Sequence, residues 1–201
     1  SPGHTELLAE LTHTRDFAMM LIGGRLRVVL ATRHVPLSAV PRMLSARAIL
    51  TAGRLAAEAL PWLGARSGAI AVCGLNPHAG DGGALGCEEA TVIMPAIRSL
   101  RRRGIDARGP LAGDAVFHAA ARGAYGAVVA MYHDQGLGPL KTIAFERGVN
   151  LTLGLPIVRT SPDHGTAYDI AGKGIANPGS MMNAIDLAYR LASKPNPWAR
   201  R

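Results

Sequence analysis

Blocks of apolar and polar residues alternate along the chain, and they predict strands and helices in turn. Short runs of small or branched apolar residues are typical of buried strands; they occupy 68–75 (GAIAVCGL), 124–132 (AYGAVVAMY) and 149–158 (VNLTLGLPIV). Two further apolar runs, 17–23 and 26–32, are separated only by Gly24 and Arg25. That spacing predicts a β-hairpin.

Longer segments between these runs have the spacing of helices. Residues 36–64 carry Leu, Ile and Ala at helical intervals, interrupted by Pro41 and Gly53. Residues 88–104 begin with acids and end with bases, which favours the helix dipole. A last helix is expected over 180–193, before a proline-rich stop. Alternating strands and helices indicate an α/β protein with a largely parallel sheet.

Polar motifs follow three of the predicted strands. They are NPHAGDGG (76–83), HDQG (133–136) and RTSPDHGTA (159–167). Ligands of open α/β sheets bind beyond the carboxyl ends of the strands. We therefore expect the three motifs to form a site at one edge of the sheet.

Composition indicates one substantial domain, or one domain and part of another, in 201 residues. Apolar residues make up 48% and aromatic residues only 4%, so aliphatic side chains and Met must fill the core. No apolar window has transmembrane length, and no signal peptide opens the chain. The two cysteines give no disulfide framework, which favours a reducing compartment. We predict a soluble, cytoplasmic protein with no membrane partner.

A net charge of +8 raises the possibility of nucleic-acid binding. The arginines, however, are scattered, with one short cluster at Arg101–Arg103 near the end of a predicted helix. A solvated helix end and anionic small substrates explain this distribution without a duplex. We predict no nucleic-acid partner.

Histidines supply the candidate metal chemistry. His78 and His133 each lie just past an apolar strand beside glycines, and His4 is a third candidate in PGHTE. Imidazole commonly binds zinc and other first-row divalent ions, although a single loop histidine is more often a surface residue. Three further histidines lack this setting and are interpreted as surface residues: His13, His34 and His118.

The segments PGHTE, CGLNPHAGDGG, AMYHDQG and the run from 140 to 181 occur in an order that resembles the 4-hydroxythreonine-4-phosphate dehydrogenases of the pyridoxine-phosphate pathway. The resemblance runs from Pro2 to about Ala192. It implies an isocitrate/isopropylmalate dehydrogenase-like two-domain α/β/α fold, with an earlier N-terminal part of the family absent here. By analogy, residues 1–142 form a central dimerising and metal-site domain, and 143–201 complete the cofactor-binding domain.

The same resemblance assigns the metal site. It implies that His4, His78 and His133 bind one divalent ion (Zn, Mg or Co), in a site that both subunits of a homodimer build. Asp114 is a good helix N-cap by its position, and the resemblance places it near the metal as a catalytic residue. Asp81 and Asp134 adjoin the histidines, where a carboxylate can orient an imidazole or merely occupy a loop.

Three side chains are candidates for binding an anion. Arg159 offers a bidentate fork and Lys141 a compact charge, while Asn150 interrupts an apolar run. From the residues alone, Lys141 can equally lie on a solvated helix surface and Asn150 at a turn or strand edge. The resemblance implies that all three contact a phosphorylated substrate and that Lys141 also acts in catalysis.

The cofactor prediction rests on the glycine-rich stretch 171–179 and the residues before it. No GxGxxG fingerprint is present, so the usual Rossmann phosphate loop is excluded. The stretch can be a plain connector, yet it also resembles the adenosine loop of isopropylmalate and isocitrate dehydrogenases. That resemblance implies NAD or NADP bordered by His164, Gly165, Thr166, Ala167 and Asn177.

The implied reaction oxidises the secondary alcohol of 4-phosphooxy-L-threonine by hydride transfer to NAD(P)+. Loss of CO2 then gives 3-amino-2-oxopropyl phosphate, in vitamin B6 biosynthesis. Three alternatives remain open: a four-carbon acid phosphate or an aromatic cis-dihydrodiol dicarboxylate as substrate, a non-catalytic anion-binding fragment, or a fragment that only dimerises.

Overall fold

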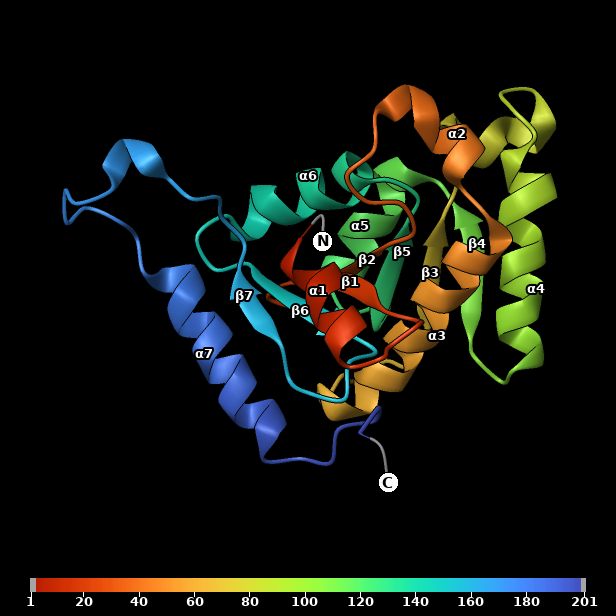
Figure 1. Ribbon diagram of the computed structural model, residues 1–201. Coiled ribbons are helices and arrows are strands. Elements are labelled where there is room, and N and C mark those ends of the chain that lie inside the picture. Colours follow the sequence, from red (N-terminus) through yellow and green to blue (C-terminus); the bar gives the residue numbers. More distant parts are fainter. Residues whose placement is uncertain (1–2, 200–201) are drawn as a thin grey trace.

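A single seven-stranded sheet organises the chain, with helices on both of its faces (Figure 1). The computed structural model describes residues 3–199, so Ser1, Pro2, Arg200 and Arg201 lie outside the described part. The strand order is β4-β3-β5-β2-β1-β6-β7. The strands are β1 Ala18–Gly23, β2 Leu26–Leu30, β3 Ile70–Cys73, β4 Ala107–Leu111, β5 Ala127–Ala130, β6 Val149–Leu153 and β7 Thr160–Pro162.

Seven α-helices and four short helical turns connect the strands over residues 3–199. The helices are α1 His4–Leu11, α2 Val40–Met43, α3 Ala46–Trp62, α4 Met94–Arg102, α5 Gly113–Ala121, α6 His133–Ala144 and α7 Gly179–Ala192. The turns are η1 Leu37–Ala39, η2 Pro77–Gly83, η3 Glu89–Ile93 and η4 Tyr168–Ile170. None of the helices among the described residues has the length and apolar character needed to cross a bilayer.

The α/β prediction is confirmed, but the sheet is less parallel than expected. β2, β5, β3 and β4 pair in parallel, whereas β1 pairs antiparallel with both β2 and β6. β7 in turn pairs antiparallel with β6. The predicted hairpin is present as β1 and β2, with Gly24 at φ +60°, a conformation that glycine adopts without a Cβ penalty.

The expectation that all three polar motifs share one edge of the sheet is wrong for the third motif. Residues 149–158 were predicted as one strand, but β6 ends at Leu153 and Gly154 turns the chain at φ +91°. β7 then runs back along β6, so RTSPDHGTA contains a strand of opposite direction instead of following the carboxyl end of one. The apolar run continues past Gly154 to Val158, and β7 itself is the short segment Thr160–Pro162, so the hydrophobic pattern gave no sign of the reversal.

The long helical pattern from 36 to 64 divides in two. η1 and α2 end before Ser45, whose Oγ accepts a hydrogen bond from the Ala48 N–H at 3.2 Å and begins α3. The segment 88–104 is helical as predicted, but it opens with the π-turn η3 before α4. Arg101 and Arg102 lie in the last turn of α4, the solvated helix end expected from the sequence.

Aliphatic side chains and Met fill the core, as composition predicted. Val28, Val29, Ile70, Val128 and Leu151 of the central strands are fully buried. All seven strands belong to one sheet, and the predicted domain boundary at residue 142 falls inside α6. The two-domain division itself remains a prediction.

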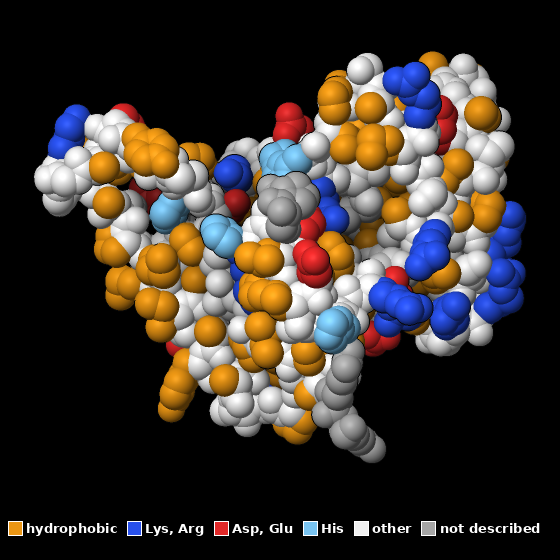
Figure 2. Space-filling view, viewed as in Figure 1, with side chains coloured by type: hydrophobic (Ala, Val, Ile, Leu, Met, Phe, Trp, Pro, Cys, Tyr) orange, Lys and Arg blue, Asp and Glu red, His pale blue; other side chains and the backbone are white. Residues whose placement is uncertain are grey.

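Helix α7 differs from the other long helices because much of its apolar surface is exposed. Met182, Ile185 and Tyr189 are 63%, 63% and 78% exposed. Figure 2 shows hydrophobic side chains gathered over this helix, whereas Lys and Arg gather on the opposite side of the view. The loop between β7 and α7 extends away from the sheet (Figure 1).

Candidate functional site

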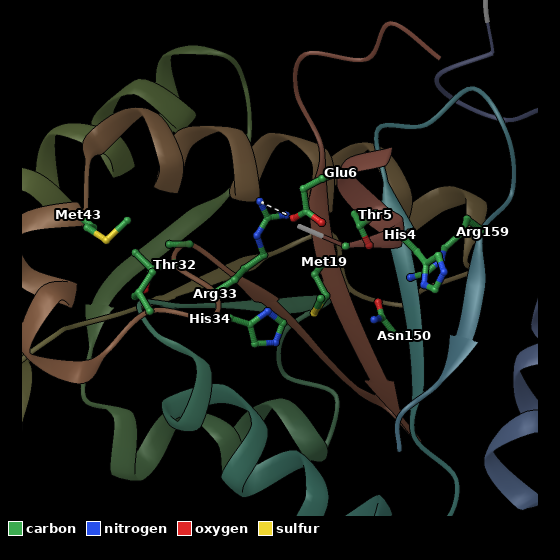
Figure 3. A pocket seen from close by; sticks show the side chains of 13 residues that line it. His4, Thr5, Glu6, Met19, Thr32, Arg33, His34, Met43, Asn150 and Arg159 are labelled. Atoms are coloured by element: carbon green, nitrogen blue, oxygen red, sulfur yellow. Dashed lines mark ion pairs between the residues drawn. The ribbon is translucent and has the colours of Figure 1, made fainter. Parts of the chain in front are cut away.

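A cavity on the antiparallel side of the sheet, beneath α1, gathers several of the predicted site residues. Its volume is about 580 Å³, and it gathers His4, Asn150 and Arg159, three residues predicted for the site. Thr5 and Glu6 of α1 and residues 31–35, which follow β2, complete its walls. Figure 3 shows His4, Asn150 and Arg159 side by side. We call this space the His4–Arg159 cavity.

Arg159 gives the His4–Arg159 cavity its cationic character. Its Nη1 donates to Thr152 Oγ1 at 3.3 Å, and the described residues provide it no ion pair. Burial lowers the pKa of Arg159, and the Glu6 carboxylate opposes that shift. Asn150 Oδ1 is buried and has no hydrogen-bond partner among the described residues. A ligand with an anionic group and a hydrogen-bond donor would satisfy both side chains.

Arg33 was not predicted from the sequence, although it lines the same cavity. Its Nη2 lies 3.6 Å from Glu6 Oε1, and its guanidinium stacks 4.8 Å from the Phe17 ring centroid. The ion pair is drawn in Figure 3. Glu6 therefore compensates part of the positive charge at this site.

His34 is exposed, as the sequence interpretation expected, but it also lies beside a second histidine, which the sequence did not indicate. Its ring centroid lies 5.4 Å from that of His133, with the planes at 45°. His34 lines the His4–Arg159 cavity and also a neighbouring cavity of about 450 Å³ that includes His133 and Asp134. Its position directly after β2, at the edge where His133 follows β5, was the available signal.

His133 is oriented by its neighbour. Its Nδ1 lies 2.6 Å from Asp134 Oδ1, which fits a carboxylate that orients the imidazole. A proton on Nδ1 donated to that carboxylate leaves the Nε2 lone pair free for a metal ion.

Gln135 joins the two strand ends that carry the predicted motifs. Its Nε2 donates to the Gly74 carbonyl at 2.7 Å, and its Oε1 accepts from the Met131 N–H at 2.7 Å. At the next residue a Cβ on Gly136 would lie 2.5 Å from Val28 Cγ1 and 3.0 Å from Ala130 Cβ. The glycine of HDQG thus allows α6 to begin directly against the sheet.

The loop that carries His78 is a left-handed coil. His78, Ala79 and Asp81 have φ of +52°, +53° and +44°, and the φ angles of Gly80 and Gly82 are also positive. Such angles cost a residue with a Cβ on the order of 1 kcal/mol. The glycines of NPHAGDGG therefore serve a backbone that turns in the sense least favourable to other residues.

Buried Glu89 holds that coil in place. Its Oε1 accepts from the backbone N–H groups of Leu75 and Asn76, both at 2.7 Å, and its Oε2 accepts from Asn76 Nδ2 at 2.9 Å. Burial disfavours the ionised carboxylate, but the hydrogen bonds from Asn76 and Leu75 outweigh it and lower the pKa. The sequence indicated only an acid near a helix start.

The three histidines predicted as metal ligands do not come together within one chain. Among residues 3–199, no three His, Cys, Asp or Glu side chains are arranged to hold a metal ion. His4 lies in the His4–Arg159 cavity, His78 is exposed on its own coil, and His133 lies beside His34.

Lys141 and Asp163 form a further polar contact. Lys141 Nζ lies 3.7 Å from Asp163 Oδ1. Burial raises the pKa of Asp163 and outweighs the opposing effect of Lys141. Asp163 Oδ2 is buried without a partner among the described residues. The sequence analysis named Lys141 but not this carboxylate.

The remaining predicted residues are exposed. Asp114 lies in the first turn of α5 but does not cap it, because the N-cap position is Ala112. His164, Gly165, Thr166 and Ala167 belong to the loop after β7. Asn177 Oδ1 accepts from the Gly179 N–H at 2.9 Å, where α7 begins. Their cofactor and catalytic roles remain predictions.

Comparison with known proteins places these features in a family. The family profile described as "Pyridoxal phosphate biosynthetic protein PdxA" matches residues 1–188. The chain belongs to the PdxA family.

Individual PdxA relatives agree with this result. The chain is 54% identical over 191 residues to a 4-hydroxythreonine-4-phosphate dehydrogenase of Geobacter metallireducens, covering 95% of this chain and 56% of that protein. It is also similar to the crystal structure of the Klebsiella pneumoniae 4-hydroxythreonine-4-phosphate dehydrogenase, with a TM-score of 0.87 and 46% identity. That match covers 96% of this chain and 59% of the other.

A less similar solved structure is that of a protein with a different name. A terephthalate 1,2-cis-dihydrodioldehydrogenase of Burkholderia xenovorans has a TM-score of 0.76 and 33% identity, covering 94% of this chain and 60% of its own. The chain spans about 56% to 60% of the length of the first curated PdxA relatives it matches. The fold is thus that of the PdxA dehydrogenases over the shared length.

Proposed function

We propose that this chain supplies the substrate- and metal-binding part of an NAD(P)-dependent dehydrogenase that oxidises 4-phosphooxy-L-threonine in pyridoxal phosphate biosynthesis, in the cytoplasm. One observation carries the proposal: His4, Asn150 and Arg159 meet in one cavity, and His34 joins that cavity to His133. Membership of the PdxA family and the identity to named 4-hydroxythreonine-4-phosphate dehydrogenases support the choice of substrate.

Arg159 binds the substrate phosphate in this proposal. Its guanidinium has fork geometry and no competing carboxylate partner among the described residues. Lys141 adds a second cation, held beside Asp163. Asn150 accepts a hydrogen bond from the substrate through the Oδ1 that is otherwise unpaired. Binding the phosphate away from the reacting carbon turns its binding energy into positioning.

Divalent metal binding is assigned to the neighbouring cavity of about 450 Å³, which His34 shares with His133. The pair His34 and His133 fits a metal ion because the ring centroids lie 5.4 Å apart and the contact with Asp134 leaves His133 Nε2 available. We place His34 with His133 as ligands and retain His78 as a ligand from a second copy of the chain. When bound, the ion would act as a Lewis acid toward the reacting alcohol oxygen.

The loop from His164 to Asn177 is the proposed site for the adenosine of NAD or NADP. The bound nicotinamide would accept the hydride, while the loop orients the cofactor. A homodimer is part of the same proposal, since one chain does not assemble three metal ligands among its described residues.

The test measures zinc content and binding of 4-phosphooxy-L-threonine separately. We expect His34→Ala and His133→Ala to lose bound zinc, whereas His118→Ala, an exposed histidine on α5, retains it. The substrate should bind the wild-type chain more tightly than an aromatic cis-dihydrodiol dicarboxylate does. Zinc retained in both His34→Ala and His133→Ala, or preference for the dicarboxylate, would contradict the assignment.

A further inference from the structure

A second charged cavity lies at the opposite end of the parallel strands. It has a volume of about 370 Å³ and is lined by Arg25, Arg27, Arg66 and Arg122, together with Ser67 and Tyr125. Arg25 and Arg27 flank the start of β2, and Tyr125 lies just before β5. Ser67 precedes β3. We call this space the basal arginine pocket.

The positive charge of the basal arginine pocket is not compensated. No Asp or Glu lines it, and none of its four guanidinium groups forms an ion pair within residues 3–199. This differs from Arg33 in the His4–Arg159 cavity, which is paired with Glu6. Four unpaired like charges around one concavity create a positive potential that attracts anions.

Arg27 distinguishes this pocket from a set of solvated surface arginines. Its Nη1 donates to the Arg25 and Gly126 carbonyls at 3.2 and 3.4 Å, which fixes the guanidinium against the sheet. Its Nε is buried and has no acceptor among the described residues. Burial also lowers the pKa of Arg27. A buried donor on a cation without an acceptor is costly, and a bound anion would remove that cost.

We infer that the basal arginine pocket binds a small multivalent anion carrying one or two phosphate groups. Guanidinium forks match phosphate oxygens in geometry and charge. The hydroxyl groups of Ser67 and Tyr125 can donate to the same oxygens. A volume of about 370 Å³ suits a small organic phosphate or pyrophosphate.

Pyrophosphate is the probe for the test. Calorimetric titrations are made in an Arg159→Gln background, which removes binding at the His4–Arg159 cavity. In that background, Arg27→Gln and Arg122→Gln are each compared with the chain that carries Arg159→Gln alone. We expect either basal substitution to weaken pyrophosphate binding by about tenfold or more. Arg122 is exposed, so Arg122→Gln keeps the inference testable if Arg27→Gln does not fold.

Arg103→Gln is the matched control. Arg103 is exposed at the end of α4, and its substitution removes the same charge as Arg122→Gln. Unchanged affinity in that variant supports a built site. Equal weakening in Arg103→Gln and Arg122→Gln would show only an effect of net charge and would overturn the inference. Tight binding of a short RNA or DNA duplex through Arg122, with pyrophosphate binding absent, would also overturn it.

Discussion

Strand β2 connects two cavities of contrasting chemistry. Beyond its last residue, Leu30, the His4–Arg159 cavity mixes histidines, an amide, two arginines and a glutamate. At its first residues, the basal arginine pocket presents guanidinium groups without a carboxylate. The strand spans five residues, or about 15 Å. The mixed cavity can orient and polarise a substrate, whereas the basal arginine pocket can bind charge but has no histidine or carboxylate for acid-base chemistry.

The largest expected effect is on the free energy of unfolding, and it should leave the basal arginine pocket intact. Glu89→Ala leaves the N–H groups of Leu75 and Asn76 without an acceptor, so we expect a loss of about 3 kcal/mol in the free energy of unfolding. Chemical denaturation measures it. Basal pyrophosphate binding should persist in the folded fraction, because the His78 coil lies at the other end of β3. A loss below about 0.5 kcal/mol would contradict the role of Glu89.

The same carboxylate gives a pH dependence of known sign. Because the folded pKa of Glu89 lies below its ordinary 4.5, its stabilisation is complete above 4.5 and is lost as pH falls through the lowered pKa. Glu89→Gln should therefore reduce the acid dependence of the free energy of unfolding. An unchanged slope would show that Glu89 is not its source.

Arg159→Gln tests through substrate binding whether the two cavities are independent. Loss of the charged fork should weaken binding of 4-phosphooxy-L-threonine by roughly 10- to 100-fold, measured by calorimetry. Arg27→Gln should leave that affinity within about twofold, since its guanidinium lies at the other end of β2. If both variants weaken substrate binding equally, the two cavities are not independent.

Asp134→Asn should have a smaller effect, confined to the affinity for metal. An amide at this position no longer accepts a charge-assisted hydrogen bond from His133 Nδ1, so zinc affinity should fall by about tenfold. Competition with a chelator of known affinity measures the change. Asp81→Asn is the matched control, because Asp81 lies on the His78 coil.

Asp163→Asn should produce the smallest effect, and with the opposite sign. Because burial raises the folded pKa of Asp163, its contribution to stability is lost as pH rises through that pKa. The amide should therefore increase the free energy of unfolding at pH 7 by up to about 1 kcal/mol and flatten its pH dependence. Destabilisation at pH 7 would instead show that the Lys141 contact dominates.

The sequence predicted the regular part of the fold because hydrophobic periodicity reports local structure. The hairpin at Gly24, strands β3 and β5, and helices α4 and α7 follow from it. The antiparallel return through Gly154 did not, because the apolar run continues past Gly154 to Val158 and β7 is only the short segment Thr160–Pro162. Direction within a sheet depends on pairing, which a local pattern does not encode.

The two cavities were predictable to different degrees. His4, Asn150 and Arg159 stand in recognisable motifs, so the resemblance identified them before the structure brought them together. His34 was missed because it has no flanking glycine and gains its setting only from His133 across the sheet. The basal arginines are spread from Arg25 to Arg122, and only the parallel strands bring them together.

Gly136 has a consequence for how this gene can vary. Every missense change of one nucleotide in a glycine codon introduces a side chain with a Cβ, and at Gly136 that atom would lie 2.5 Å from Val28 Cγ1. Gly138, two residues further along α6, has open space around the corresponding point. Among natural variants of this chain, substitutions should therefore accumulate at Gly138 and be purged at Gly136, two positions that look alike in the sequence.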